Sequence, residues 1–403
     1  MLTDRKIILG ITGGIAAYKV IDWLRELRRE NAEVTVIMTE SATKFVTPLT
    51  LAALSGNQVY TDLFDQQEAA NIPHINLGRN HDLILIAPAT ASTIARLANG
   101  LADDLLSATT LAGTAKVLIC PAMNSNMYLH PATQVNLTKL KEFGYIIMDP
   151  ENGKMACNEE GPGRLPEWQS VREEILTCFS PQDLSNQAIL VSAGPTREPL
   201  DPVRYLGNRS TGKMGFALAA TAHRRGAKVT LVSGPVTLPH PPGVKVVEVN
   251  TATEMHKVIM DLCHDSSIVV KAAAVSDFRP GTYSSRKIKK QTSGLELKLE
   301  KNPDILAELG LLKKNNKKFP FLIGFAAESH DLLEEGWRKL KEKNLDMIVV
   351  NDITSSDSGF ETDSNRVTIL DKNGTEKKLP LLSKEETSCQ IWDRVVKLMS
   401  EDR

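Results

Sequence analysis

The fold is decided by residues 6–38, which read KIILGITGGIAAYKVIDWLRELRRENAEVTVIM. Residues 6–10 are a short apolar run that ends in glycines, as at the end of a strand. Within residues 20–27, apolar side chains recur at spacings of four and three between charged ones, which predicts an amphipathic helix. Residues 33–38 form a second apolar run. A strand, a glycine turn, a helix and a strand open a βαβ unit.

The same alternation continues along the chain. Residues 83–88 and 116–120 are nearly continuous apolar runs, as in parallel strands that are covered on both faces. A second series begins near residue 188, with a helix expected at 214–225 and strands at 188–192, 228–233, 268–270, 321–325, 347–350 and 367–370. We therefore expect an α/β protein with two doubly wound, Rossmann-like domains. A polar stretch with a proline separates the series, which places the domains at 1–180 and 188–403 and a linker at 181–187.

Length and composition limit the classes of function. The chain has 403 residues, 42% of them apolar, with 48 Lys+Arg against 49 Asp+Glu. The formal net charge of -1 gives no general attraction to nucleic acid or to an anionic membrane. No apolar run approaches the roughly 20 residues that a membrane-spanning helix needs. The 5 cysteines are scattered without a C-x-x-C pair, which suits a reducing compartment, so we expect a cytoplasmic protein.

The first glycine loop, residues 10–19, is a candidate phosphate site. Glycines allow a close approach of the backbone to a ligand, and the N–H groups at a helix start favour an anion. The loop lacks the G-x-G-x-x-G fingerprint, and Thr39 and Ser41 stand where an acidic ribose ligand would end the second strand. This counts against a dinucleotide-dependent dehydrogenase. A tight turn without a ligand is the alternative.

The second glycine loop, residues 207–214, reads GNRSTGKM. It fits G-x-x-x-x-G-K, but Met214 occupies the Ser/Thr position that holds magnesium in a P-loop. The loop also lies far beyond its strand, so we reject a Walker ATPase. Ser210, Thr211 and Lys213 still form a candidate anion site with the start of the following helix.

Three further residues of the first half are candidates for chemistry. His74 precedes the strand at residue 83, Asn124 follows the strand that ends at residue 120, and Cys157 lies in a glycine-rich polar segment. Ligands of open α/β sheets bind at the carboxyl ends of strands, where an amide can hold a carboxylate or cap a turn. A lone histidine near a strand is more often packed or solvated than catalytic. A cysteine in an exposed flap is a candidate for acid or redox chemistry.

In this order, the motifs of the first half resemble the flavin-dependent cysteine decarboxylase family, which implies a flavodoxin-like first domain. They are residues 10–19, the segment around His74, APATAST at 87–93, PAMNSNMY at 121–128 and the flap around Cys157. The resemblance implies bound FMN, held by Gly13, Gly14, Thr39, Ser41, Thr90, Ser92 and Thr93. It makes His74 the catalytic base, Asn124 the carboxylate-binding amide and Cys157 the proton donor. Many relatives carry Asn where this chain has Ser92.

The resemblance also implies the reaction of the first domain. The flavin would oxidise the substrate thiol to a thioaldehyde, carbon dioxide would leave, and the electrons would return to the ene-thiol without net oxidation. A non-catalytic flavoprotein that serves as a regulatory or interaction subunit is the alternative. The joint presence of His74, Asn124 and Cys157 argues against that alternative.

The second half resembles phosphopantothenate–cysteine ligases through GPTREPLD at 194–201, NRSTGKMG at 208–215, AAAVSDF at 272–278 and KIKK at 287–290. The resemblance implies that CTP and magnesium drive the coupling of cysteine to 4'-phosphopantothenate through an acyl-cytidylate, with release of pyrophosphate. It places Asn208 at the acyl-cytidylate and makes Arg204 and Lys289 substrate-binding residues. The implied nucleotide-binding residues are Ala272, Ala273, Ala274, Asp277, Lys287, Asn302, Pro303, Asp304, Ile305, Phe325, Lys339 and Lys343. Without the resemblance, the lysine run would be a solvated surface, and no metal ligands can be read from the sequence.

Together the two halves resemble the bifunctional enzymes of bacterial coenzyme A biosynthesis. Such an enzyme would ligate cysteine to 4'-phosphopantothenate and then decarboxylate the product to 4'-phosphopantetheine. Its partners would be small-molecule substrates, with no nucleic acid and no membrane. Relatives of both domains assemble into oligomers, so we expect a homo-oligomer.

Overall fold

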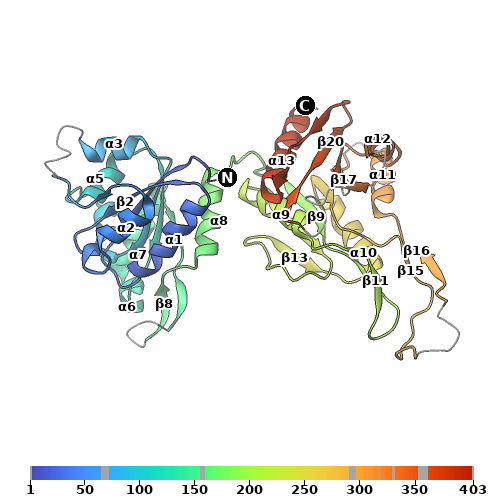
Figure 1. The fold of residues 1–403 in the computed structure, drawn as a ribbon, viewed down its shortest axis with the longest axis horizontal. Coiled ribbons are helices and arrows are strands. Elements are labelled where there is room, and N and C mark those ends of the chain that lie inside the picture. The colour runs from blue at the N-terminus through green and yellow to red at the C-terminus, as the bar shows by residue number, and fades with distance from the viewer. Residues whose placement is uncertain are drawn as a thin grey trace. The chain divides into compact units, whose positions relative to one another are not determined.

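The structure is a computed structural model that describes residues 2–64, 72–154, 159–289, 296–316, 318–328, 332–352 and 362–401. The chain divides into two compact units, Met1–Phe179 and Ser180–Arg403, which Figure 1 colours from blue to green and from green to red. Each unit is built on a largely parallel sheet with helices, which confirms the predicted α/β class. The predicted proton donor Cys157 and the last lysine of the 287–290 motif lie outside the described residues.

The first unit contains a six-stranded sheet of order β3-β2-β1-β4-β5-β6, in which every neighbouring pair is parallel. The strands are β1 (Lys6–Ile11), β2 (Glu33–Met38), β3 (Val59–Tyr60), β4 (Leu83–Ala89), β5 (Lys116–Pro121) and β6 (Ile146–Ile147). Apart from the two-residue β3, the order is the 2-1-3-4-5 order of flavodoxin. Its switch point lies between β1 and β4, and ligands of such sheets bind at the carboxyl ends of the strands there.

Alternation along the strands divides the apolar side chains between the two faces of this sheet. Ile7 and Leu9 pack into a cluster with α1, α2 and α8, whereas Ile8 and Ile84 pack into a second cluster with α4, α5 and α7. Burial on both faces explains why the strands read as apolar runs. The helices are α1 (Ala17–Arg29), α2 (Pro48–Ser55), α3 (Pro73–Arg79), α4 (Ala91–Ala98), α5 (Leu105–Ala112), α6 (Ser125–Leu129), α7 (Pro131–Glu142) and α8 (Trp168–Phe179), with a 3-10 turn at Ala42–Lys44.

The glycine-rich segment predicted as a flap forms the arms of an antiparallel hairpin, β7 (Glu151–Lys154) and β8 (Glu160–Arg164). The hairpin is anchored on the turn that follows β5. The N–H of Met123 donates to the carbonyl of Gly163 at 3.0 Å, and Ser125 Oγ donates to the carbonyl of Pro162 at 2.8 Å. The hairpin therefore lies beside the carboxyl end of β5.

The second unit contains an eight-stranded sheet of order β13-β12-β9-β14-β17-β18-β20-β21. The order reverses between β9 and β14, so the switch point lies there. Within this sheet the pairs β18–β20 and β20–β21 are antiparallel, and the other pairs are parallel. The strands are β9 (Ala188–Ala193), β12 (Lys228–Ser233), β13 (Lys245–Glu248), β14 (Ile268–Lys271), β17 (Phe321–Glu328), β18 (Met347–Asp352), β20 (Val367–Asp371) and β21 (Glu376–Lys378).

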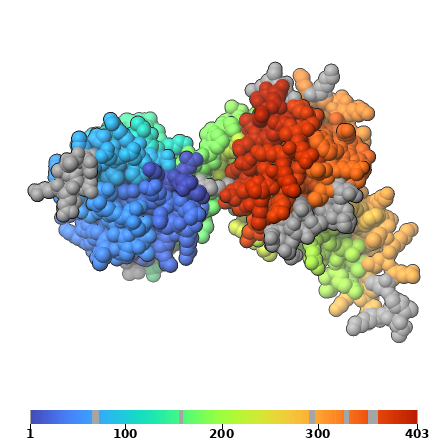
Figure 2. Space-filling view, turned by 45° about the horizontal axis from the view of Figure 1, so that its top comes forward, coloured from blue at the N-terminus to red at the C-terminus, as the bar shows by residue number. Residues whose placement is uncertain are grey.

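Helices cover both faces of the second sheet. One apolar cluster contains α9 (Lys213–Arg224) and α13 (Lys384–Glu401), the latter coloured red in Figure 2, and the other contains α10 (Ala252–Leu262), α11 (Ile305–Asn315) and α12 (Leu332–Glu342). Three two-stranded ladders are added: β10 (Arg197–Pro199) with β11 (Tyr205–Gly207), β15 (Phe278–Pro280) with β16 (Leu299–Lys301), and β19 (Ser364–Asn365) with β22 (Leu382–Ser383); a 3-10 turn spans Cys263–Asp265. Over the described ranges, no helix has the length and apolar character needed to cross a membrane.

Candidate functional site

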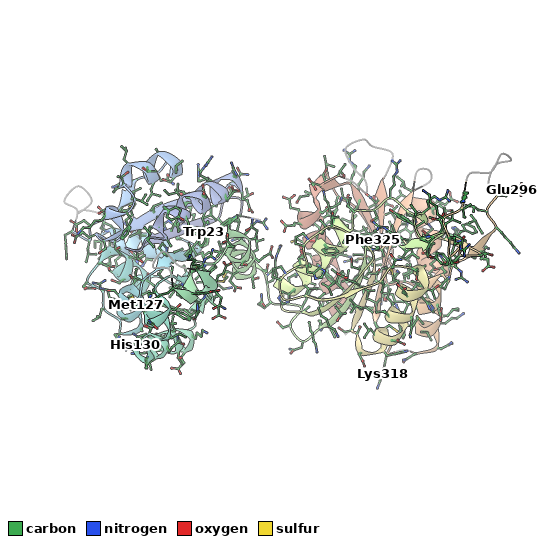
Figure 3. All side chains as sticks on the ribbon, turned by 90° about the horizontal axis from the view of Figure 1, so that it is seen from below. Trp23, Met127, His130, Glu296, Lys318 and Phe325 are labelled. Atoms are coloured by element: carbon green, nitrogen blue, oxygen red, sulfur yellow. The ribbon has the colours of Figure 1, made fainter. Side chains whose placement is uncertain are left out.

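The first unit has a cavity of about 680 Å³ at the carboxyl ends of β1, β4 and β5. Gly13 and Gly14 line it from the loop after β1, Thr90 from the loop after β4, and Asn124 from the loop after β5. Met127, labelled in Figure 3, also lines it, as do Tyr18 and Lys19 of α1 and Lys154 and Arg164 of the β7–β8 hairpin. The cavity therefore lies at the switch point, where a doubly wound sheet binds its ligand.

Thr12 ties the first two of these loops together. Its buried Oγ1 donates to the carbonyl of Pro88 at 2.6 Å and accepts from the N–H of Thr90 at 3.0 Å. One hydroxyl thus bridges a carbonyl and an amide at the end of β4, and main-chain groups of this kind need hydrogen-bond partners when they are buried. Sequence reasoning did not single out this residue, because a threonine inside a glycine loop carries no pattern of its own.

Gly13 brings the loop after β1 against the end of β2. A Cβ on Gly13 would lie 2.3 Å from Ser41 Cβ and 2.9 Å from the Ser41 carbonyl carbon, so no side chain fits. Gly14 is less crowded, because its nearest neighbour would be 3.7 Å away. Thr39 Oγ1 is buried and has no hydrogen-bond partner among the described residues. A buried hydroxyl without a partner is open to a ligand.

The three predicted hydroxyls around α4 differ in their surroundings. Thr90 lines the cavity and caps α4, accepting from the N–H of Thr93 at 3.4 Å. Thr93 is buried behind this cap. Ser92 is exposed and accepts from a guanidinium nitrogen of Arg96 at 3.2 Å, and it is not part of the cavity lining.

The predicted catalytic residues of the first half are not gathered in this cavity. Asn124 lines it, and its Nδ2 donates to the carboxylate of Glu159 while its Oδ1 caps α6. His74 lies in the first turn of α3, outside the lining, and its Nδ1 is buried with no hydrogen-bond partner in the described part of the chain. The third, Cys157, lies outside the described residues.

In the second unit, two adjoining cavities of about 580 and 540 Å³ open at the carboxyl ends of β14, β17 and β18. Both are lined by Ala273, Val275, Asp277 and Phe325, and Figure 3 labels Phe325. Of the other predicted residues, Asn208, Ala272, Ala274 and Lys339 line the larger cavity, and Asn302, Pro303, Asp304, Ile305 and Lys343 line the smaller one.

The larger cavity is lined by cations. Arg209, Lys213, Lys339 and Lys384 contribute to its wall, and α9 begins there after Gly212, whose φ of 77° favours glycine. Lys213 pairs with Asp363 at 2.5 Å. Lys384 is buried, and burial lowers its pKa to about 8, assisted by the charge of Lys213. Several cations at a helix start suit a phosphate chain. Sequence reasoning did not identify Lys384, which begins a helix remote in sequence from every motif.

The smaller cavity combines one ion pair with amide and apolar groups. Asp304 caps α11 and pairs with Lys343 at 2.8 Å. Burial opposes ionisation of Asp304, but hydrogen bonds from Lys343 and from the N–H of Ala307 outweigh it and lower the pKa of this carboxyl. Asn302 Nδ2 donates to the carbonyl of Ser276 at 2.8 Å.

Lys271 also lines the smaller cavity, and sequence reasoning missed it. It is the last residue of β14 and is 7% exposed. Burial lowers its pKa to about 7, with Lys343 contributing and Asp304 opposing. A lysine that ends an apolar strand directly before residues 272–274 was the signal in the sequence.

Arg204 and the two described lysines of the 287–290 motif lie outside both cavity linings. The Arg204 guanidinium binds Asp201 Oδ2 at 2.6 and 3.0 Å and donates to the carbonyl of Ile288 at 2.9 Å. Asp201 Oδ2 also accepts from the N–H of Ile288 at 3.1 Å. Hydrogen bonding from Arg204 is the main cause that holds the pKa of Asp201 well below its usual range. This contact fixes the segment that carries the exposed Lys287 and Lys289.

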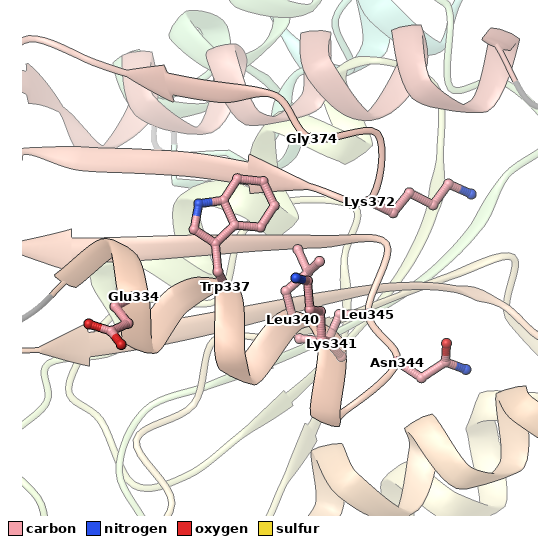
Figure 4. A pocket seen from close by; sticks show the side chains of 8 residues that line it. All are labelled: Glu334, Trp337, Leu340, Lys341, Asn344, Leu345, Lys372 and Gly374. Atoms are coloured by element: carbon pink, nitrogen blue, oxygen red, sulfur yellow. The ribbon is translucent and has the colours of Figure 1, made fainter.

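A groove of about 720 Å³ at the opposite end of the second sheet does not share these features. It lies between α12 and the turn after β20 and is lined by Trp337, Lys341 and Lys372 among others (Figure 4). Although it is larger than either cavity, it lies at the amino end of β18, and no predicted site residue lines it. Ligands of doubly wound sheets bind at the other end.

The described ranges contain neither a cluster of potential metal ligands nor a cysteine with a lowered pKa. They contain no group of three or more His, Cys, Asp or Glu side chains that could hold a metal ion. Cys120, Cys178, Cys263 and Cys389 are free thiols. Burial raises the pKa of each of them, to about 12 for Cys178, so these four thiols are unreactive near neutral pH.

Comparison with known proteins identifies both units. Residues 1–180 match the family model described as Flavoprotein, and residues 184–399 match the DNA/pantothenate metabolism flavoprotein C-terminal domain. The chain is 44% identical to the coenzyme A biosynthesis bifunctional protein CoaBC of Bacillus subtilis, over 100% of this chain and 99% of that protein. It is 47% identical to the CoaBC protein of Escherichia coli K12, over 98% and 97%. A crystal structure of the C-terminal domain of a CoaBC protein covers 55% of this chain and 100% of its own, with 39% identity and a TM-score of 0.47.

The match to the CoaBC proteins extends over both units and leaves no segment of either unaccounted for. The chain therefore belongs to the family of coenzyme A biosynthesis bifunctional proteins CoaBC.

Proposed function

We propose that the chain catalyses two consecutive reactions of coenzyme A biosynthesis. The second unit is the phosphopantothenate–cysteine ligase, and the first unit is the phosphopantothenoylcysteine decarboxylase, which forms 4'-phosphopantetheine. The observation that carries this function is the pair of separate ligand sites. Each unit has its own cavity at the carboxyl end of its own doubly wound sheet. Family membership over the full length supports both activities.

We propose FMN as the flavin of the first unit, and the residues present fit it. Gly13 has no side chain at the point where the loop after β1 contacts Ser41, so the backbone is accessible there. The buried Thr39 hydroxyl has no hydrogen-bond partner in the described structure. Gly13, Gly14, Thr39, Ser41 and Thr90 would hold the cofactor. Thr93 would act through the Thr90 cap, and Ser92 keeps its predicted role despite its contact with Arg96. When bound, a flavin supplies a reversible two-electron acceptor, so a thiol substrate can lose carbon dioxide without net oxidation.

The protein groups of the decarboxylase would bind the substrate and move its protons. Asn124 Nδ2 would bind the substrate carboxylate, and the carboxylate of Glu159 already occupies this donor. Cys157, which lies outside the described residues, would donate a proton, and the arms of the β7–β8 hairpin that flank it in the sequence are anchored beside Asn124. His74 would act as the base through its imidazole, whose Nδ1 lacks a partner among the described residues. General acid–base groups contribute typically about 10²–10⁴-fold.

The ligase would form an acyl-cytidylate in the cation-lined cavity of the second unit. Lys339 and Lys343, together with Lys287, would neutralise the triphosphate of CTP, and Asn208 would bind the activated acyl group. Asn208 is fixed there because its Nδ2 donates to the carbonyl of Val275 at 3.0 Å. The exposed Arg204 and Lys289 would contact the phosphopantothenate. Magnesium would arrive with the triphosphate and take its oxygens and water as ligands.

We also propose a cytoplasmic homo-oligomer. The first unit exposes large apolar side chains outside its cavity lining, among them Phe45 at 47% and Leu49 at 80%. Where such side chains gather into a contiguous patch, the patch marks a surface that another subunit can cover. The four described cysteines are free thiols, as in a reducing compartment.

Asn124→Asp tests the decarboxylase. The variant places a carboxylate where the substrate carboxylate would bind, and we expect a loss of at least about 10²-fold in carbon dioxide release from 4'-phosphopantothenoylcysteine. Asn126→Asp is the matched control, because this exposed side chain lies two residues away outside the cavity lining. Flavin absorption should be kept in both variants. Decarboxylation at the wild-type rate by Asn124→Asp would contradict the assignment. Bound flavin without decarboxylation by the wild type would favour a regulatory flavoprotein.

A further inference from the structure

Helix α3 carries the proposed base near an end that has little local stabilisation. His74 lies in the first turn of this seven-residue helix, and no side chain caps that turn. Pro73 suits the first helical position, but the residue before it, Ile72, has a φ of 44°. That conformation is costly for a β-branched side chain. The position of α3 must therefore depend on contacts made further along the helix.

The ring of His74 lacks the hydrogen bond that commonly orients a catalytic imidazole. A catalytic histidine is usually held by a partner on the ring nitrogen that does not react. The Nδ1 of His74 is buried and has no hydrogen-bond partner in the described part of the chain. The placement of this imidazole therefore depends on the backbone of α3.

Contacts near the other end of α3 fix the helix to its surroundings. A Cβ on Gly78 would lie 2.8 Å from the carbonyl oxygen of Thr109, so α3 and α5 approach there backbone to backbone. His81 follows the helix by two residues and contacts the Leu77 carbonyl through Nδ1 at 2.7 Å. Its Nε2 contacts the hydroxyl of Thr35 on β2 at 3.0 Å. One imidazole thus joins the last turn of α3 to the sheet.

Resting on the decarboxylase function proposed above, we propose that His81 is a positioning residue for His74. It holds α3 at a fixed place on the sheet, and the imidazole of His74 keeps its place with the helix. Seven helical residues span only about 10 Å, so a shift of the last turn also moves the first. A misplacement of about 1 Å can cost about 10²-fold in rate. His81 itself lies outside the cavity lining.

The hydrogen bonds of His81 define its tautomer. The Leu77 carbonyl can only accept, so Nδ1 carries the proton, and in the neutral ring Nε2 accepts from the Thr35 hydroxyl. Burial lowers the pKa of His81, although the bond to Leu77 and the charge of Glu33 oppose the shift. The ring is therefore neutral at pH 7 and serves as a fixed bridge between α3 and β2.

His81→Phe tests the proposal, because it keeps an aromatic ring and removes both nitrogens. In the decarboxylation of 4'-phosphopantothenoylcysteine we expect kcat to fall about 10- to 100-fold, with KM within a few-fold. Flavin absorption and the ligase activity of the same protein should stay as in the wild type. Arg79→Gln is the matched control, since Arg79 is exposed at the end of the same helix. It should turn over like the wild type.

A second pair of variants keeps the proposal testable if His81→Phe folds poorly. Thr35→Val removes the hydroxyl that donates to Nε2 and should lower kcat in the same way, whereas Thr35→Ser keeps this hydroxyl and should turn over like the wild type. An unchanged kcat in Thr35→Val, together with inactivity of His74→Gln, would overturn the positioning role alone. Losses of flavin or of substrate affinity as large as the loss of kcat would also overturn it, because they indicate a general structural role. Wild-type turnover by His74→Gln would overturn the base assignment and the positioning role with it.

Discussion

Replacing Thr12 with valine tests how the strand ends shape the flavin cavity. Valine keeps the branched shape but removes the hydroxyl that donates to the Pro88 carbonyl at 2.6 Å and accepts from the Thr90 N–H at 3.0 Å. Each group left without a partner costs about 1–3 kcal/mol. We therefore expect local stability to fall by about 2–6 kcal/mol for the two groups together. Flavin binding should weaken as well, because Thr90 lines the cavity.

Hydrogen exchange measured by mass spectrometry reports this change on the first unit alone. In peptides that cover β1 and β4, a loss of about 2 kcal/mol accelerates exchange roughly 30-fold. Thr12→Ser is the control, since it keeps the hydroxyl and should exchange like the wild type. Unchanged exchange and unchanged flavin absorption in Thr12→Val would refute the role given to this hydroxyl.

Three further predictions follow from the same structure. Gly13→Ala should abolish flavin uptake, since its Cβ would lie 2.3 Å from Ser41 Cβ, and normal absorption of the purified variant would contradict this. Lys271→Met should stabilise the second unit against urea most below pH 7 and least above pH 10. Burial lowers the pKa of Lys271 from 10.5 to about 7, which corresponds to a cost of roughly 5 kcal/mol for burying the charged form. Between these two pKa values the unfolded chain holds a proton that the folded chain has lost, so the stability of the wild type rises with pH and the cost of burying Lys271 falls. A pH-independent difference in the urea midpoint would contradict it. Asp201→Ala should lower ligase kcat/KM at least about tenfold by freeing the segment of Lys287, with decarboxylation of supplied substrate unchanged; equal losses in both assays would contradict it.

Much of the fold follows from the apolar runs. β2 and β12 span the residues predicted for them, and β1, β5 and β9 extend only one residue further. Strands that are covered on both faces appear in the sequence as nearly continuous apolar runs, which are easy to recognise. The direction of β20 was not predictable, because this strand is buried on both faces and so reads as an apolar run like its parallel neighbours, although it runs antiparallel to β18. The ladder of β10 with β11 was not predicted, because strands of three residues are too short to show a periodic pattern.

The site could be predicted only where chain order implies proximity. Gly13, Thr90 and Asn124 follow three neighbouring parallel strands, and their loops meet in one cavity for that reason. Lys271 was missed although its position at the end of an apolar strand was a signal, and Thr12 was missed because a threonine inside a glycine loop has no pattern of its own. Their importance depends on burial and hydrogen bonding, which only the packed structure provides.

One assay tests most directly whether a single chain performs ligation and decarboxylation in sequence. The purified protein with FMN is incubated with 4'-phosphopantothenate, CTP, magnesium and cysteine, and the products are identified by mass spectrometry. We expect 4'-phosphopantetheine, with one pyrophosphate and one carbon dioxide released for each molecule formed. Accumulation of 4'-phosphopantothenoylcysteine without its decarboxylation, or recovery of 4'-phosphopantothenate unchanged, would contradict it.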